Sequence, residues 1–420
     1  MPAPRNMRRP SASPAANDSA HRAGYGIADR LAPERPLLSM SRFAFCLALL
    51  WAASPVVGAD VCRARHDYDE IVAAATERFY DRAFRGLDWP SRVEHYRRKV
   101  RCDDREQHVA IEVNALLSEL HASHTALYTQ ADIDYWGLSS LFAPRLTDFA
   151  LNFAGIWPQR QGDGWYAKYV LEGSPAARAG VRQGDHLALL NGQAFNPLDF
   201  TGQADLLVAS SDGRARRDVS IQSTRVSIMQ AFIDASNASR TTFIRQGKRV
   251  GYFHLWTARD AILQSLQAAI AEFDAARVDG LILDFRGGYG GTSPDYLAPL
   301  RASAHLMSLP KVFLIDDGVR SGKEMLAAMV RKQKLGTLVG SRTAGGFLGA
   351  VPVRLLDDRY FLLVAAYDGI PLDLPTIEGV GVQPDVRVAP CRMRCAGRDP
   401  QLEKALELLG SVSHSNPPPQ

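Results

Sequence analysis

The hydrophobic pattern along the chain changes character twice, and the first part has the spacing of helices. Between residues 64 and 122, apolar side chains recur every three or four positions, most clearly over 71–84 and 109–120. That spacing places them on one face of an α-helix. We therefore expect a helical region at residues 60–149.

Residues 150–232 contain short strand-like runs instead, such as 165–170, separated by glycine and aspartate turns. A turn followed by a short helix is expected over 173–180. The next strand should end in a hairpin turn at Asn191–Gly192, because this dipeptide favours two-residue hairpin loops. The pattern predicts a β-rich domain.

From residue 249 to 390 the pattern alternates between buried strands and amphipathic helices. Strands are expected over 250–255, 280–285, 311–315 and 336–339, and helices over 261–276 and 321–331. Such a βαβ series predicts an α/β core with a largely parallel sheet. A hairpin is expected over 351–365, and residues 391–420 should form one helix and a disordered Pro-rich end.

The N-terminus has the features of a targeting sequence. Residues 40–59 combine a short positive start, an apolar run and the small-residue cleavage site Val57-Gly58-Ala59, which is typical of a signal peptide. The run is too short for a spanning helix, which needs about 20 apolar residues. We expect a periplasmic or secreted protein without stable membrane insertion after cleavage; an uncleaved anchor is the alternative.

Residues 1–39 are rich in Arg, Pro, Ala and Ser, which predicts disorder, or a start codon assigned too early with Met40 as the true start. Residues 1–59 hold seven arginines and three acidic residues, and the remainder holds 42 basic and 42 acidic residues. The mature chain is therefore neutral and lacks the basic footprint of a nucleic-acid-binding protein.

Four of the five cysteines, Cys62, Cys102, Cys391 and Cys395, would remain after Cys46 leaves with the signal peptide. An even number suits an oxidising compartment, and three pairings can be drawn. We prefer Cys62–Cys102 with Cys391–Cys395, which ties down the mature N-terminus and closes a short loop. A metal at the last pair is disfavoured because no histidine cluster accompanies it, so we expect no metal.

Candidate chemistry gathers in four segments of the α/β core. The first is the glycine-rich turn 284–291, which follows a buried strand. Its glycines leave backbone N–H groups unobstructed, and such groups can bind an oxyanion. A phosphate loop is disfavoured, because the Lys-Ser/Thr of the Walker pattern is absent.

The second segment places Ser321 at the expected start of a helix. A serine there is usually an N-cap, but the next N–H, that of Gly322, points to where negative charge would develop in a reaction. The third segment is the turn 340–346, and the fourth, 377–385, contains Glu378.

These four segments, in this order, resemble the C-terminal processing (tail-specific) serine peptidases over roughly residues 65–390. Residues 284–291 resemble the family's Asp-Leu-Arg-x-Asn-x-Gly-Gly loop, Ser321–Glu324 its Ser-Ala-Ser-Glu segment, and residues 378–385 its Glu-Gly-x-Gly-Val-x-Pro-Asp segment. The resemblance implies a crotonase-like α/β core.

The stretch Ser174 to Gly192 resembles a PDZ domain, which binds a peptide C-terminus as an added strand. Residues 154–157 would then fit its carboxylate-binding loop. The implied domain would bind the C-termini of protein or peptide substrates, or gate the active site.

One departure from the family changes the expected mechanism. Many members use a Ser–Lys dyad with the lysine in a Thr-x-Gly-Lys-Gly turn, where this chain has Gly346. No lysine lies between Lys334 and Lys404. Lys323 is two residues from Ser321 and should project from a different side of the helix, so we expect its loss to matter little.

The Thr343-to-Gly346 turn and the Ser123-His124-Thr125 segment instead resemble the tricorn-like branch, which uses Ser, His and Glu. The implied catalytic residues are Ser321, His124 and Glu378, with Ser123 as a candidate orienting residue. The implied oxyanion hole is Gly322 with Gly290 or Gly291.

Competing assignments stay open for two of these roles. His121 is the alternative base and Ser293 the alternative nucleophile, whereas Asp284 and Asp385 are expected to be structural. If the base is a histidine with an ordinary pKa, kcat/KM should rise with pH as a group with a pKa of roughly 6–7.5 loses its proton.

The resemblance thus implies an exported serine endopeptidase that acts through an acyl-enzyme on Ser321 and needs no cofactor. There are two alternatives. The protein could be a catalytically inactive relative that binds ligands or peptides in the envelope, or a PDZ scaffold for an envelope partner.

The expected signal peptide and cysteine pairing give a first testable prediction. The mature protein should begin at Asp60 and contain no free thiol, because cleavage follows Ala59 and the four remaining cysteines pair. Intact mass and thiol titration of non-reduced exported protein check this. Two or more reactive thiols would contradict it.

Overall fold

The computed structural model describes residues 62–411, except 163, 210–214, 292–294, 369–376 and 392–397. The expected leader and signal peptide therefore lie outside the described residues, as do Ser293 and Cys395. No helix in the described part of the chain combines the length and the apolar character that crossing a bilayer requires.

Three helices form the expected N-terminal helical region: α1 (Arg63–Arg78), α2 (Trp89–Arg97) and α3 (Glu106–Ser118). Asp88 caps α2 by accepting a hydrogen bond from the Ser91 N–H, and Pro90 occupies an early helical position that lacks an intrahelical acceptor. Their apolar faces share one core, whose largest fully buried members include Tyr68 and Phe79.

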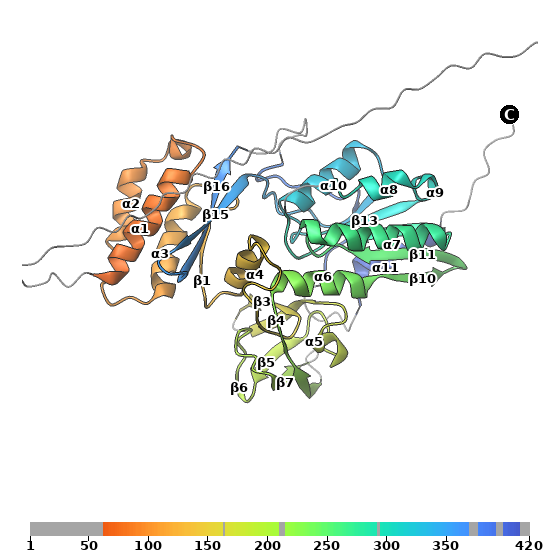
Figure 1. Cartoon of the computed structure of the whole chain (residues 1–420), viewed down its shortest axis with the longest axis horizontal. Helices are drawn as coiled ribbons and strands as arrows, with labels where there is room; N and C mark the ends of the chain where they lie inside the picture. Colours follow the sequence, from red (N-terminus) through yellow and green to blue (C-terminus); the bar gives the residue numbers. More distant parts are fainter. Residues whose placement is uncertain are drawn as a thin grey trace, which may run out of the picture. The chain divides into compact units, whose positions relative to one another are not determined.

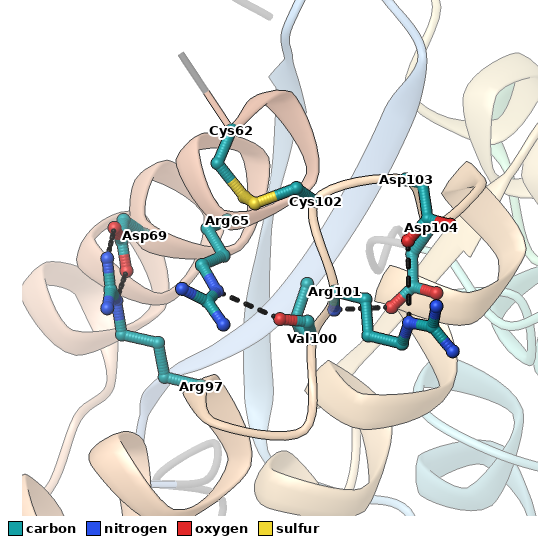
Figure 2. The surroundings of a disulfide bond; sticks show 9 residues. All are labelled: Cys62, Arg65, Asp69, Arg97, Val100, Arg101, Cys102, Asp103 and Asp104. Carbon is teal, nitrogen blue, oxygen red and sulfur yellow. Dashed lines mark hydrogen bonds and ion pairs between the residues drawn. A yellow bond between two sulfur atoms is a disulfide. The ribbon is translucent and has the colours of Figure 1, made fainter. Parts of the chain in front are cut away.

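A disulfide closes the helical region, as Figure 2 shows. Cys62 at the start of α1 is bonded to Cys102 in the loop before α3, so this predicted pairing is confirmed. Beside it, Arg65 donates to the carbonyl oxygen of Val100 at 3.0 Å. Cys391 is also disulfide-bonded, but the pairing expected for it involves Cys395, outside the described residues.

The region expected to be helical also contains a strand. Strand β1 (Ala126–Thr129) pairs antiparallel with β16 (Tyr360–Tyr367), which forms the predicted hairpin with β15 (Gly349–Leu355). Helix α4 (Ile133–Leu141) follows β1. The pairing brings the segment just before β1, which contains His124, close to the C-terminal part of the chain.

The expected β-rich region contains a sheet in the order β3-β4-β5-β7-β8, with β6 on β5, and a separate β2–β9 pair. Asn191 and Gly192 both have positive φ, at 50° and 77°, between β5 and β6. The predicted hairpin turn is therefore present. The bounds are β2 Leu151–Phe153, β3 Ile156–Gln161, β4 Gly164–Val170, α5 Pro175–Arg178, β5 His186–Leu190, β6 Gln193–Ala194, β7 Gln203–Ala209, β8 Arg216–Gln222 and β9 Thr224–Val226.

The α/β core is built on a six-stranded sheet in the order β10-β11-β12-β13-β14-β17. Only the β10–β11 pair is antiparallel; the other neighbours are parallel, as the βαβ pattern predicts. The strands are β10 Thr241–Arg245, β11 Lys248–His254, β12 Gly280–Asp284, β13 Lys311–Ile315, β14 Thr337–Gly340 and β17 Val386–Arg387.

Helices cover both faces of this sheet, which explains why β12 and β13 are buried throughout their length. Leu281 and Leu283 share a core with α7 and α10, whereas Ile282 shares one with α11. Figure 1 shows α7, α10 and α11 around the strands. The core helices are α6 Ile228–Ser239, α7 Leu263–Ala275, α8 Ala298–Ala302, α9 Ala304–Ser308, α10 Gly322–Lys332 and α11 Pro400–Ser411.

The parallel sheet determines where the candidate segments meet. The glycine turn follows β12, the Ser321 loop follows β13, and the turn 340–346 follows β14. Because the carboxyl ends of parallel strands lie at one edge of a sheet, these three segments gather there. The fold therefore brings together residues that are far apart in the sequence.

Candidate active site

Ser321 occupies the N-cap position of α10, but its side chain does not cap the helix. Its backbone is in an unusual conformation, with φ of 55° and ψ of −130°, and its N–H donates to the carbonyl oxygen of Gly346 at 2.8 Å. Within the described chain its hydroxyl has no hydrogen-bond partner. The strained backbone therefore holds Ser321 with its hydroxyl available, as a nucleophile requires.

A cavity of 950 Å³ is lined by Ser321, His124, Gly290 and Gly291. Most of its other walls are apolar, formed by Leu138, Leu141, Phe142, Leu146, Met325 and Leu363. Ser321 and His124 do not hydrogen-bond to each other in the described structure. They nevertheless face one apolar space that is large enough for a peptide side chain.

His124 is connected to Glu378 through Ser123 rather than directly. The Ser123 hydroxyl lies 3.0 Å from Nδ1 of His124 and donates to Oε2 of Glu378 at 2.8 Å. The backbone N–H of Ser123 donates to the other carboxylate oxygen at 2.9 Å. Ser123, expected as a candidate orienting residue, therefore lies between the histidine and the carboxylate.

The same contacts assign the tautomer of His124. A hydroxyl has one hydrogen, and that of Ser123 points to the Glu378 carboxylate. Its oxygen must then accept from Nδ1–H of His124, which leaves the lone pair on Nε2. A neutral imidazole with a free Nε2 is the form that a general base requires.

Glu378 also anchors the neighbouring turn. Its Oε2 accepts hydrogen bonds from the N–H groups of Phe347 at 2.7 Å and Leu348 at 3.1 Å. Glu378 does not line the cavity. Its carboxylate can therefore orient Ser123 and, through it, His124, without touching a ligand.

Burial and, to a smaller extent, the nearby Arg320 guanidinium lower the pKa of His124 to about 4, against the opposing influence of Glu378. An ordinary histidine would titrate at about 6.5. The buried imidazole therefore predicts an acid limb near pH 4, in place of the roughly 6–7.5 expected for a histidine with an ordinary pKa.

Gly346, at the position of the dyad lysine, leaves room for the imidazole. A Cβ added to Gly346 would lie 3.5 Å from Cε1 of His124 and 3.6 Å from Cβ of Ser123. A side chain at this position would therefore begin in van der Waals contact with the ring.

Three backbone N–H groups near Ser321 are available to bind an anion. A Cβ added to Gly290 would lie 2.6 Å from Cβ of Ser321 and 3.0 Å from the Gly322 nitrogen, so the glycine turn contacts the start of α10. In the described structure, the N–H groups of Gly290, Gly291 and Gly322 have no acceptor. A Cβ added to Gly322 would in turn lie 2.4 Å from the carbonyl oxygen of Gly291, so the candidate oxyanion donors are Gly322 with Gly290 or Gly291.

Glu324 has a role that the sequence did not reveal. Its buried carboxylate accepts hydrogen bonds from the Thr343 hydroxyl at 2.5 Å, the Gly345 N–H at 2.6 Å and the Gly346 N–H at 2.7 Å. Burial raises its pKa. Glu324 therefore shapes the turn against which His124 lies, and the Ser-x-x-Glu spacing was the available signal.

The remaining candidates lie elsewhere. His121 is exposed and does not line the cavity. Asp284 accepts from the Tyr252 hydroxyl and pairs with Arg286, while Asp385 accepts from the Leu338 N–H. No group of three metal-ligating side chains occurs among the residues that the structure describes.

Comparisons with known proteins find similar peptidases. Residues 294–388 match peptidase family S41. The chain is 26% identical over 365 residues to the chloroplastic C-terminal processing peptidase of Tetradesmus obliquus, covering 76% of each protein. It is 25% identical over 407 residues to Tricorn protease homolog 1 of Streptomyces coelicolor, covering 84% of this chain and 36% of that protein.

The solved structure of the photosystem II D1 C-terminal processing protease is similar in fold, with a TM-score of 0.51 at 20% identity. The similarity covers 83% of this chain and 97% of that one. This chain is thus similar to peptidase family S41 over residues 294–388, and to C-terminal processing peptidases and tricorn protease homologues over most of its length.

The lowered pKa of His124 predicts an unusual pH profile. Because the base must be neutral, kcat/KM for a peptide should rise with pH through an apparent pKa of about 4. Arg320→Met should move this limb to higher pH by removing a positive charge, whereas Arg320→Lys should not. A wild-type limb near 6.5, unmoved by Arg320→Met, would contradict the assignment of His124.

Proposed function

We propose that the chain is a serine endopeptidase whose nucleophile is Ser321 and whose base is His124. The observation that carries the proposal is the shared cavity. It is lined by a serine whose hydroxyl does not cap its helix, by a neutral imidazole and by glycines whose N–H groups have no acceptor in the described structure. The match of residues 294–388 to peptidase family S41 supports the reaction class.

In the proposed reaction, Oγ of Ser321 attacks the carbonyl carbon of a peptide bond while Nε2 of His124 takes its proton. The resulting imidazolium is stabilised through Ser123 by the Glu378 carboxylate. The oxyanion accepts hydrogen bonds from the N–H group of Gly322, at the positive end of α10, and from that of Gly290 or Gly291.

Collapse of this intermediate breaks the C–N bond, and His124 returns the proton to the leaving amine. Water, activated by the same imidazole, then hydrolyses the acyl-enzyme and restores Ser321. Every step uses groups of this chain and water, so the mechanism needs no cofactor.

The substrates that we propose are protein or peptide chains with an apolar side chain beside the cleaved bond. The apolar walls of the cavity support this preference. The relatives named as C-terminal processing peptidases suggest cleavage near a C-terminus. We propose that residues 150–232 act as a PDZ-like domain for that C-terminus, and that the core is crotonase-like.

We also propose that the protein acts in the periplasm or outside the cell. The signal peptide expected at residues 40–59 supports this, as does the Cys62–Cys102 disulfide, because disulfides persist in oxidising compartments.

The proposal is tested by labelling and by variants with matched controls. A fluorophosphonate should label the wild type, and Ser321→Ala should lose labelling and peptidase activity by a factor on the order of 10⁴ or more. His124→Ala should lose activity similarly and Glu378→Gln less, because the imidazole still functions without its orienting carboxylate. The controls are Ser308→Ala and His121→Ala, neither of which lines the cavity.

Activity retained in purified Ser321→Ala would contradict the nucleophile. Loss in His121→Ala but not in His124→Ala would contradict the base. A folded wild type that never reacts with fluorophosphonate would instead favour the ligand-binding alternative, for which the large apolar cavity is the supporting observation.

A further inference from the structure

Lys323 lies two residues after the proposed nucleophile, and its side chain is fully buried, at 0% exposure. Its Nζ donates to the carbonyl oxygens of Leu255 at 3.1 Å, Trp256 at 3.3 Å and, at shorter range, Gly287. An ammonium has exactly as many N–H donors as there are acceptors here, whereas a neutral amine has one fewer. The geometry therefore suits the charged form.

Gly287 is also held through its backbone N–H. The N–H of Gly287 donates to Oδ1 of Asp316 at 3.1 Å, and that oxygen also accepts from the Gly318 N–H at 2.9 Å. Gly287 has φ of 59° and begins the glycine turn. Both of its backbone polar groups are thus held by side chains from the Ser321 loop and helix α10.

The far end of this turn reaches the nucleophile. The carbonyl oxygen of Gly290 accepts from the Ala258 N–H at 3.0 Å, and the α-carbon of Gly290 packs against Ser321 and the Gly322 nitrogen. Lys323 directly follows Gly322 in α10. One side chain therefore links the helix that carries one candidate oxyanion donor to the turn that carries the other.

The charges around Lys323 are closely balanced. The two nearby aspartates favour the ammonium, but burial, which is the largest influence, and Arg320 oppose it and lower the pKa of Lys323 to about 7. The charged groups that act on Lys323 are Asp316, Asp284 and Arg320; His254 and Arg286 pair with Asp284, and the Tyr169 hydroxyl donates to Asp316.

We propose that Lys323 is a positioning residue, whose ammonium holds the glycine turn and the start of α10 in the relative position that forms the oxyanion hole. The inference rests on the proposed function of Ser321. Lys323 is not the base, because its hydrogen bonds are directed to backbone carbonyls and it does not line the cavity. The sequence-based expectation that its loss matters little is replaced by this inference.

The decisive variant is Lys323→Met, which keeps the length of the side chain and removes its donors. Lys334→Met is the matched control, because Lys334 is exposed just beyond α10. With a peptide substrate, Lys323→Met should lower kcat by about 10²-fold, the loss expected for a displacement of about 1 Å, and leave KM within about twofold. Affinity for a peptide aldehyde should fall by the same factor as kcat/KM.

A second measurement does not depend on activity. Amide hydrogen exchange over residues 285–291 should be faster in Lys323→Met than in the wild type and in Lys334→Met. Unchanged kcat with unchanged exchange would overturn the proposal. If the wild type cleaves no peptide but exchange is still faster in Lys323→Met, the proposed function is contradicted, whereas the positioning role of Lys323 is supported.

If Lys323→Met does not fold, the proposal can be tested on the wild-type protein alone. Raising the pH from about 6 to about 9 should deprotonate Lys323 and remove one donor. Exchange over residues 285–291, corrected for its intrinsic pH dependence, should then increase relative to that of β13. Equal protection of the turn at both pH values would overturn the proposal.

Discussion

The candidate site depends on one carboxylate. Glu378 accepts hydrogen bonds from the N–H and hydroxyl of Ser123 and from the N–H groups of Phe347 and Leu348. These contacts join three segments that are distant in sequence: the end of the helical region, the turn after β14 and the loop before β17. Without that carboxylate, the Ser123 hydroxyl could turn, and the imidazole of His124 would lose the partner that sets its tautomer.

The parallel sheet supplies the other half of the site, and buried charged side chains adjust it. Its strand ends deliver the glycine turn, the Ser321 loop and the 340–346 turn to one edge, as in other α/β proteins. Glu324 then shapes the last of these turns, and Lys323 contacts the first. Two consecutive residues of α10 thus reach the segments on either side of the nucleophile, at the desolvation cost that burying charges entails.

Much of the core could be predicted because fully buried parallel strands appear as short apolar runs, as at 280–285 and 311–315. The Asn191–Gly192 turn followed from local chemistry, whereas Cys62–Cys102 was the preferred one of three possible pairings. Strand β1 could not be predicted, since it has four residues and its partner, Leu363 opposite Ala126, comes much later in the chain. The pKa of His124 and the carbonyl contacts of Lys323 depend on burial by distant segments, for which the sequence has no local signal.

The account is tested most directly by a crystal structure of the wild-type protein bound to a peptide aldehyde. It predicts a covalent bond between Oγ of Ser321 and the aldehyde carbon, with Nε2 of His124 beside the adduct. The hemiacetal oxygen should lie about 3 Å from the amide nitrogen of Gly322 and from that of Gly290 or Gly291. An adduct on Ser293, or an aldehyde held in the cavity without a bond to Ser321, would contradict it.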